Sequence, residues 1–347
     1  MLPRISRREF LKLGALALGV MAASPLPAID APPASSGATS PLKLGRVARR
    51  SIYAHEQPDV GSDRTEKISR DTLLELLEEL ASPAGPEHNP RWYRIAGGYV
   101  HSAYIQPVKQ QLNTPLLEVP QAGLPAQVTM PFTQTQYQDR QGNWMPLYRL
   151  YYGSIHWITG LSQSPEGQPW YRLTDEWLGV HYYAAAEHLR PLSAEELAPI
   201  SPHLLPEEKR IEVSLEKQTL TAYERDLPVY QALVSTGKRS METPSGEFFV
   251  NRKTPSKHMG DGGLTKDPNA YEFVGVPWTS FFSDRGVAFH GTFWHDNFGT
   301  PMSAGCVNMH TAEAMWLFRW CMPVYAGRVE GREDWKVEGA GTKVRVY

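Results

Sequence analysis

Apolar and polar residues alternate over short stretches along much of the chain, and this pattern predicts strands. A period of two is typical of a half-buried strand, because successive side chains point to opposite faces. The alternation is clearest at residues 211–215, 218–223 and 229–234, and a last run of this kind occupies residues 343–347. The 29 Pro and 28 Gly among 347 residues add turns between short segments. We therefore expect a mainly β fold.

A Trp-Tyr-Arg-aliphatic phrase occurs at residues 92–95 and again at residues 170–173. Each copy is followed by a turn and a second strand-like run, as in a strand–turn–strand unit. The phrase resembles the closing strands of bacterial Src-homology-3-like barrels, which implies one or two small β-barrel-like modules within residues 91–205. The aromatic side chains then either fill the barrel interiors or line a groove for glycan or peptide.

Two segments carry helical spacing. Leucines at positions 73, 74, 77 and 80 form one apolar stripe, so residues 65–80 are predicted to be a helix. Residues 31–90 would then be a linker that contains this helix, which ends before the Pro- and Gly-rich residues 82–86. A short amphipathic helix is predicted to start at Thr311, which we expect to cap it.

The first 30 residues are typical of a targeting segment. Residues 6–12, Ser-Arg-Arg-Glu-Phe-Leu-Lys, resemble a twin-arginine export signal, and an apolar stretch follows at residues 13–23. That stretch is short for a membrane span, so cleavage is expected, with a weak membrane anchor as the alternative. The Pro-, Ala- and Ser-rich residues 24–41 predict a flexible tether. The resemblance implies the twin-arginine export machinery as a partner and a location in the cell wall, the periplasm or outside the cell.

The net charge and the cysteine content bear on two further questions, nucleic-acid binding and disulfide bonding. The formal net charge is −2, which gives no reason to expect a nucleic-acid partner. The cysteines are Cys306 and Cys321. Cys321 lies in an apolar, helix-like run, where packing is its expected role, so we predict no disulfide framework.

The residues with possible catalytic roles lie within residues 287–310. An apolar run leads to His290, and Cys306 follows 16 residues later, so the loop can fold back and set imidazole against thiol. The thiolate is the nucleophile of a cysteine, and a nearby imidazole can take its proton and stabilise it as an ion pair. Gly305 allows a tight turn in which the N–H groups of Gly305 and Cys306 face a developing oxyanion. Asn308 adds a donor and an acceptor.

These residues resemble the L,D-transpeptidase (YkuD-type) catalytic domain. The family has a His-Gly or His-Ser step and a Ser/Thr-His/Arg-Gly-Cys-hydrophobic-Asn/Arg segment. The matching residues here are His290-Gly291 and residues 303–308, Ser-Ala-Gly-Cys-Val-Asn. Ala304 stands where the family has His or Arg, which removes a polar group beside the nucleophile.

The resemblance extends over residues 208–347. Ser-Thr-Gly at residues 235–237 and Thr-Pro-x-Gly-x-Phe at residues 243–248 match further phrases of the family. It implies a β-sandwich-like catalytic domain with a short helix behind the active-site loop.

By this resemblance the protein would be a peptidoglycan L,D-transpeptidase that forms 3–3 cross-links through a thioester on Cys306. His290 would act as general base and acid, the Gly291 carbonyl would orient its ring, and Gly305 would donate an N–H to the oxyanion. The substrate-binding residues would be Ser303, Asn308, Trp294 and Tyr271. The partners would be tetrapeptide stems, as donor and acceptor, at the cell-wall surface, and no cofactor or metal is implied.

Residues 251–283 are weakly patterned, and we expect a long loop there that covers the cleft, as a flap does in the family. Tyr271 or Trp278 would supply an aromatic wall, with core packing as the alternative for Trp278.

Three alternatives remain open. Water as the acceptor would make the same site an L,D-carboxypeptidase. The chain would be a non-catalytic cell-wall-binding protein if the cysteine domain were inactive. A zinc site built from His290, His295, Cys306 and His310 is disfavoured, because these residues lack the compact pairs of structural zinc sites.

Overall fold

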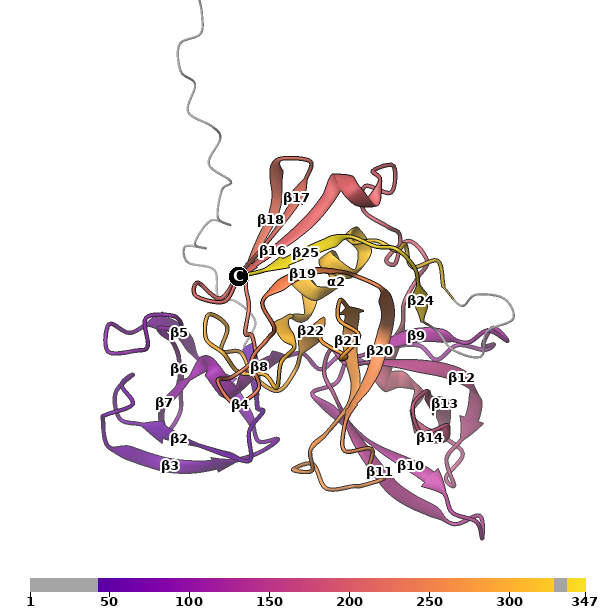
Figure 1. The fold of residues 1–347 in the computed structure, drawn as a ribbon. Coiled ribbons are helices and arrows are strands. Elements are labelled where there is room, and N and C mark those ends of the chain that lie inside the picture. Colours follow the sequence, from indigo (N-terminus) through magenta and orange to yellow (C-terminus); the bar gives the residue numbers. More distant parts are fainter. Residues whose placement is uncertain (1–42, 328–335) are drawn as a thin grey trace, which may run out of the picture. The chain divides into compact units, whose positions relative to one another are not determined.

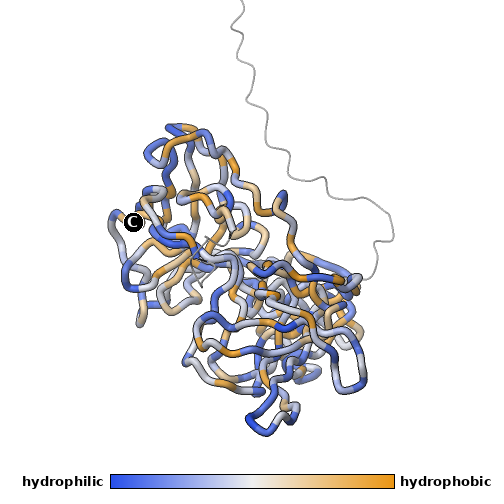
Figure 2. The backbone as a smooth tube through the Cα atoms, turned by 90° about the vertical axis from the view of Figure 1, so that its right-hand side faces the viewer, coloured by the Kyte–Doolittle hydropathy of each residue, from blue (hydrophilic) through white to orange (hydrophobic). Residues whose placement is uncertain are grey.

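The structure is a computed structural model that describes residues 43–327 and 336–347 (Figure 1). Strands dominate these residues, and α2 (Thr311–Trp320) is the one α-helix among them. Hydrophobic and hydrophilic residues alternate over short distances along the backbone (Figure 2). The mainly β fold predicted from the alternation is confirmed. The predicted signal segment and tether lie outside the described residues.

Residues 43–108 form two small sheets, with strand orders β4-β1-β8 and β3-β2-β7-β6-β5. The strands are β1 (Lys43–Val47), β2 (Ser51–His55), β3 (Arg64–Ser69), β4 (Leu73–Leu76), β5 (Glu78–Ala81), β6 (Arg91–Ile95), β7 (Gly98–His101) and β8 (Ile105–Val108). Their apolar side chains share one buried cluster, which includes Val47, Tyr93 and Ile105. These residues therefore have a core of their own.

The helix predicted at residues 65–80 is wrong, because this segment contributes to β3, β4 and β5. Asp71 has a φ of 65° and bends the chain between β3 and β4, in a conformation that a right-handed helix does not contain. Leu74 pairs with Gly45 of β1, and Leu76 is buried in the N-terminal cluster. Pairing with a distant strand overrides the local leucine spacing.

Residues 124–191 form a seven-stranded antiparallel sheet with the order β11-β10-β14-β13-β12-β9-β15. The strands are β9 (Leu124–Val128), β10 (Phe132–Gln138), β11 (Trp144–Tyr151), β12 (Ile155–Gln163), β13 (Pro169–Asp175), β14 (Val180–Ala185) and β15 (Leu189–Pro191). Both Trp-Tyr-Arg phrases are strands, as predicted, but the first lies in β6 and pairs with residues before position 91. Trp92, Tyr93 and Tyr171 are buried, as expected for core-filling aromatic residues.

Residues 209–346 contribute two five-stranded sheets, β18-β17-β16-β25-β19 and β23-β22-β21-β20-β24. The strands are β16 (Lys209–Ser214), β17 (Thr219–Glu224), β18 (Leu227–Leu233), β19 (Gly246–Phe249), β20 (Arg252–Gly260), β21 (Glu272–Phe281), β22 (Ala288–Thr292), β23 (Val307–His310), β24 (Val337–Glu338) and β25 (Lys343–Val346). One buried cluster joins both sheets and α2 through residues such as Val213, Phe289 and Leu317. The strands predicted at residues 211–234 and 343–347 are thereby confirmed.

The long loop expected at residues 251–283 is mostly a hairpin of β20 and β21, with a loop at residues 261–271. Strand β21 is almost continuously buried, so it lacks the alternation that marks a strand in the sequence. Trp278 is 1% exposed and lies 5.5 Å from Phe318 between ring centroids, which assigns it to the core. Tyr271, at the end of the loop, is 57% exposed.

Helix α2 begins directly after β23, as predicted, but Thr311 does not cap it. The N-cap is His310, which makes no capping side-chain bond, and the Thr311 hydroxyl donates to the Thr292 carbonyl at 3.4 Å. Short 3-10 helices occur at η1 (Ser102–Tyr104), η2 (Ala186–His188) and η3 (Pro206–Glu208). Among the described helices, none is both long and apolar enough to cross a membrane.

Candidate active site

His290, Cys306 and Asn308 project from one face of a sheet. Strands β22 and β23 run parallel, and His290 is paired with Asn308 in their register. Cys306 immediately precedes β23, and side chains two positions apart along an extended chain point the same way. All three side chains line one cleft. The connection between the two strands therefore returns the thiol to the imidazole.

The cleft has a volume of about 350 Å³. Its lining includes every side chain predicted for catalysis or substrate binding, namely Cys306, His290, Ser303, Asn308, Trp294 and Tyr271. Phe273 of β21 also lines it, and its ring lies 4.3 Å from the ring of Trp294 between centroids. Tyr271, Phe273 and Trp294 thus give the cleft an aromatic wall.

His290 is almost fully buried and is oriented by the backbone. Its Nδ1 donates to the Gly291 carbonyl at 3.0 Å, which leaves Nε2 free to accept a proton. Burial lowers the pKa of His290 to about 4, although the Gly291 bond acts in the opposite direction. A side chain at Gly291 would come within 2.9 Å of Pro277 and 3.0 Å of Thr311. A residue larger than glycine is therefore disfavoured at position 291, and the carbonyl of that residue orients the His290 ring.

Cys306 is a free thiol whose environment favours the protonated form. Burial raises its pKa, and a bond from the Ala288 backbone lowers it in part. Its Sγ also lies 3.9 Å from the Gly286 carbonyl oxygen, and within the described residues no hydrogen bond joins it to the His290 ring. Cys321 is also free and is completely buried. Burial therefore favours the neutral Cys306 thiol, and the ion pair expected from the sequence stays a prediction.

The turn before Cys306 is held by hydroxyl groups. Gly305 has a φ of +118°, a conformation that favours glycine. Its N–H donates to Ser303 Oγ at 3.1 Å, and Ser303 Oγ donates to the Cys306 carbonyl at 2.5 Å. Thr243 Oγ1 donates to the Gly305 carbonyl at 2.7 Å. Gly305 N–H, predicted as an oxyanion donor, is therefore engaged, while no partner of Cys306 N–H occurs in the described part of the chain.

Sequence reasoning missed several residues at this site. His295 Nε2 lies 2.9 Å from Asn308 Nδ2, and burial lowers the pKa of His295 to about 3. Lys238, Arg49 and Tyr104 also line the cleft. From the sequence, His295 is a candidate only as a zinc ligand. Arg49 and Tyr104 come from residues 43–108, where no local pattern connects them with Cys306.

The histidines considered for zinc are committed to other partners. His295 contacts Asn308, and His310 Nδ1 lies 3.5 Å from Asp296 Oδ1. Within residues 43–327 and 336–347, no group of three or more His, Cys, Asp or Glu side chains is arranged to hold a metal ion.

Residues 208–346 match the family model described as YkuD, the L,D-transpeptidase catalytic domain. The putative L,D-transpeptidase YkuD of Bacillus licheniformis is 32% identical over 106 residues, which are 30% of this chain and 56% of that protein. The putative L,D-transpeptidase YqjB of Bacillus subtilis is 32% identical over 94 residues, which are 25% of this chain and 51% of that protein. The match thus spans about half the length of these curated relatives, and it supports an L,D-transpeptidase-type catalytic domain in this part of the chain.

Two solved structures match about two fifths of this chain. An L,D-transpeptidase from Mycobacterium smegmatis is 21% identical, with 40% of this chain and 58% of that chain covered and a TM-score of 0.32. The catalytic domain of an E. faecium L,D-transpeptidase is 24% identical, with 41% of this chain and 98% of that chain covered and a TM-score of 0.29.

Proposed function

We propose that this protein is a peptidoglycan L,D-transpeptidase that forms 3–3 cross-links through a thioester on Cys306. The observation that carries the proposal is the convergence of Cys306 and His290 on one sheet face in one cleft, with His290 Nδ1 bonded to the Gly291 carbonyl. The match of residues 208–346 to the catalytic-domain family supports it. The resemblance of residues 6–12 to an export signal adds the proposal that the enzyme acts at the cell wall, outside the cytoplasmic membrane.

In the first half-reaction, Sγ of Cys306 attacks the carbonyl carbon of the third residue of a donor tetrapeptide. The thiol proton passes to Nε2 of His290, the ring nitrogen that is left available because Nδ1 is bonded to the Gly291 carbonyl. The amide bond to D-Ala then breaks, and His290 returns the proton to the leaving amine. The acyl group is now a thioester on Cys306.

In the second half-reaction, the amine of another stem attacks the thioester carbonyl. Its proton passes through His290 to the departing sulfur, and a new amide bond closes the cross-link. The oxyanion formed in each step needs donors already in place. We assign Cys306 N–H to this role, since Gly305 N–H is bonded to Ser303.

The proposal is tested by mass spectrometry of the full chain incubated with disaccharide-tetrapeptide stems. We expect a cross-linked dimer that lacks one D-Ala. Cys306→Ala should abolish this product, whereas Cys321→Ala, the matched control at the buried cysteine, should retain it. Tripeptide without dimer would assign the site to an L,D-carboxypeptidase. An unchanged stem with folded wild-type protein, or turnover by Cys306→Ala, would contradict the proposal.

A further inference from the structure

The cleft around Cys306 is cationic. Arg49 and Lys238 line it, and no Asp or Glu is among its described lining residues. Both side chains are exposed, and among the described residues neither forms an ion pair or a side-chain hydrogen bond. The Arg49 guanidinium lies over the face of Tyr104, 4.6 Å from the ring centroid. Two cations without counter-charges attract an anionic ligand into the cleft.

Arg49 reaches the cleft because the N-terminal sheets are bonded to the loop that carries Trp294. Three residues before Arg49, the buried Arg46 donates from Nη2 to the Phe293 carbonyl at 2.8 Å. The Asp296 N–H donates to the Ala103 carbonyl at 2.7 Å, and the Ala48 N–H donates to the Tyr104 carbonyl at 2.8 Å. The segments that carry Arg49 and Tyr104 are therefore joined to one another and to the loop that carries Trp294.

Lys238 approaches from a segment that is bonded to the turn before the nucleophile. Its N–H donates to the Ser303 carbonyl at 3.0 Å, and the Ser303 N–H donates to the Thr236 carbonyl at 3.0 Å. The two cations thus belong to separate parts of the chain, and both are anchored to segments that flank Cys306.

We propose that Arg49, together with Lys238, forms a carboxylate subsite that selects the donor stem peptide. This inference rests on the proposed function for the identity of the ligand. A guanidinium matches a carboxylate with two parallel N–H donors, while an ammonium acts as a point charge. A stem peptide offers a terminal carboxylate on D-Ala and, in some stems, a side-chain carboxylate. Arg49 is a specificity-determining residue because it binds one of these groups.

The first test needs no transpeptidase activity. The full chain is alkylated at Cys306 with anionic iodoacetate and with neutral iodoacetamide, and the ratio of the two rates is measured by mass spectrometry. Both reagents consume the same thiolate, so the ratio reports the potential at the thiol and not its pKa. We expect Arg49→Gln to lower the iodoacetate-to-iodoacetamide ratio about three- to tenfold, and Lys238→Gln to lower it in the same direction.

Arg50→Gln is the matched control, because Arg50 is the exposed neighbour of Arg49 and does not line the cleft. Its ratio should equal that of the wild type. An equal ratio in wild type, Arg49→Gln and Lys238→Gln would overturn the cationic subsite whatever the enzyme's substrate.

The second test identifies the carboxylate. Binding of a tetrapeptide to full-length Cys306→Ser is compared with binding of its C-terminal amide and of its side-chain amide, each with and without Arg49→Gln. One of the two amides lacks the carboxylate that Arg49 binds, and this amide should weaken binding as much as Arg49→Gln does. Combining that amide with Arg49→Gln should weaken binding little further. Independent, additive losses for both amides would overturn the assignment of Arg49.

The outcomes separate the two proposals. A lowered alkylation ratio with no stem binding would retain the anion subsite and contradict the peptidoglycan function. Cross-linking by wild type with no effect of Arg49→Gln on stem affinity or on the ratio would retain the function and contradict the subsite.

Discussion

At Cys306 and His290, burial pushes both groups toward their neutral forms. It raises the pKa of the Cys306 thiol and lowers the pKa of His290 to about 4. At neutral pH the structure therefore favours a thiol beside a neutral imidazole. Since Nδ1 is bonded to the Gly291 carbonyl, the proposed mechanism transfers the thiol proton to Nε2 as the sulfur attacks, and it does not require a thiolate in the resting enzyme.

This arrangement predicts an unusual pH profile for Cys306 alkylation. The rate with iodoacetamide should keep rising above pH 9, the ordinary thiol range, because only the thiolate reacts. His290→Gln should change the alkylation rate by less than about threefold at each pH. The same substitution should abolish cross-linking, because the imidazole acts during the attack. Mass spectrometry of the modified peptide measures the rate, and the buried Cys321 is an internal control. A plateau below pH 8 that disappears in His290→Gln would show an ion pair instead.

At the scale of elements, strands with one solvent-exposed face are predictable from the sequence, and strands that are buried on both faces are not. Strands β16, β17 and β25 alternate and were predictable. Strand β21 is buried along nearly its whole length and shows no alternation. The segment at residues 65–80 has helical leucine spacing, but its pairing with β1 and β6 is decided by residues far along the chain.

The same distinction holds for the site. His290 and Cys306 were predictable because a parallel strand pair brings a short motif together. Arg49 and Tyr104 reach the cleft only through contacts between the N-terminal sheets and the loop at residues 293–296. Such contacts depend on tertiary packing, so no spacing along the chain indicates them.

The β20–β21 hairpin is tied to the middle sheet by a buried charged triad. His258 of β20 lies between two carboxylates, with Nδ1 2.5 Å from Asp175 of β13 and Nε2 2.8 Å from Glu272 of β21. Burial by itself lowers the pKa of His258, but its bonds and charge interactions with Asp175 and Glu272 outweigh that effect and raise it. Glu272 follows Tyr271, so the triad fixes the base of the loop that reaches the cleft.

Removing His258 should therefore destabilise the protein in a pH-dependent way. His258→Gln leaves two buried carboxylates without their cation, a loss of about 3–5 kcal/mol in the free energy of unfolding. Because the folded pKa is raised, the contribution is complete below the unfolded pKa of about 6.5 and is lost as pH rises through the folded pKa. The difference between wild type and His258→Gln should thus shrink from pH 6 to pH 9.

Urea unfolding at a series of pH values measures this difference. His181→Gln is the control, because His181 is exposed and its ring bonds to Thr174 alone among the described side chains. Its stability should follow the wild type throughout. A His258→Gln deficit that stays constant from pH 6 to pH 9 would mean that the triad is not charged.

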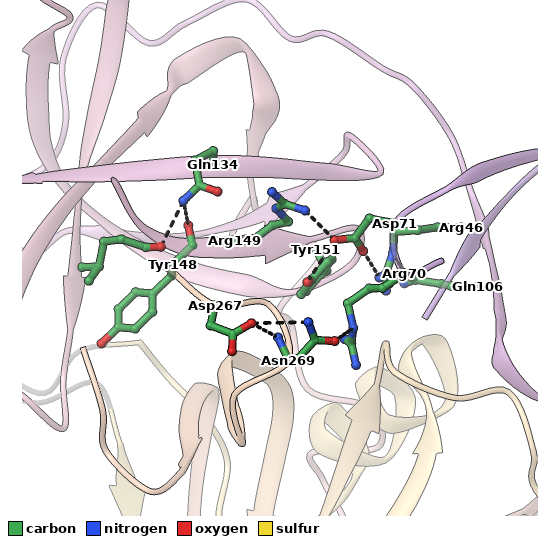
Figure 3. Close-up of polar contacts among 11 residues, drawn as sticks. Arg46, Arg70, Asp71, Gln106, Gln134, Tyr148, Arg149, Tyr151, Asp267 and Asn269 are labelled. Atoms are coloured by element: carbon green, nitrogen blue, oxygen red, sulfur yellow. Dashed lines mark hydrogen bonds and ion pairs between the residues drawn. The ribbon is translucent and has the colours of Figure 1, made fainter. Parts of the chain in front are cut away.

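At the scale of the molecule, one buried arginine joins three segments that are far apart in sequence. Arg46 of β1 pairs with Asp71 at 2.8 Å, and its guanidinium lies 4.1 Å from the ring centroid of Tyr151 in β11 (Figure 3). Asp71 also pairs with Arg149 at 2.7 Å. Since Arg46 donates to the Phe293 carbonyl, this hub connects the N-terminal sheets, the middle sheet and the loop that carries Trp294.

Loss of the Asp71 carboxylate should increase hydrogen exchange in all three segments that Arg46 connects. Burial lowers the pKa of Arg46, and the charge of Asp71 opposes that shift. Asp71→Ala would leave Arg46 buried without a carboxylate, at a cost of about 3–5 kcal/mol in the free energy of unfolding. Hydrogen exchange should then increase in residues 43–47, 149–151 and 293–297, and the stem KM should rise because Arg49 and Trp294 lose their common support.

The matched control is Glu78→Gln, which removes the partner of Arg94 in an exposed pair and should change stability by less than about 1 kcal/mol. Exchange that increases in residues 70–73 alone, with the loop at 293–297 unchanged, would show that Asp71 has only a local role. Exchange that increases in all three segments would mean that the N-terminal sheets support the cleft around Cys306 directly. In that case the geometry of the Cys306 site is a property of residues 43–346 together, although the motif that identifies it occupies residues 290–308.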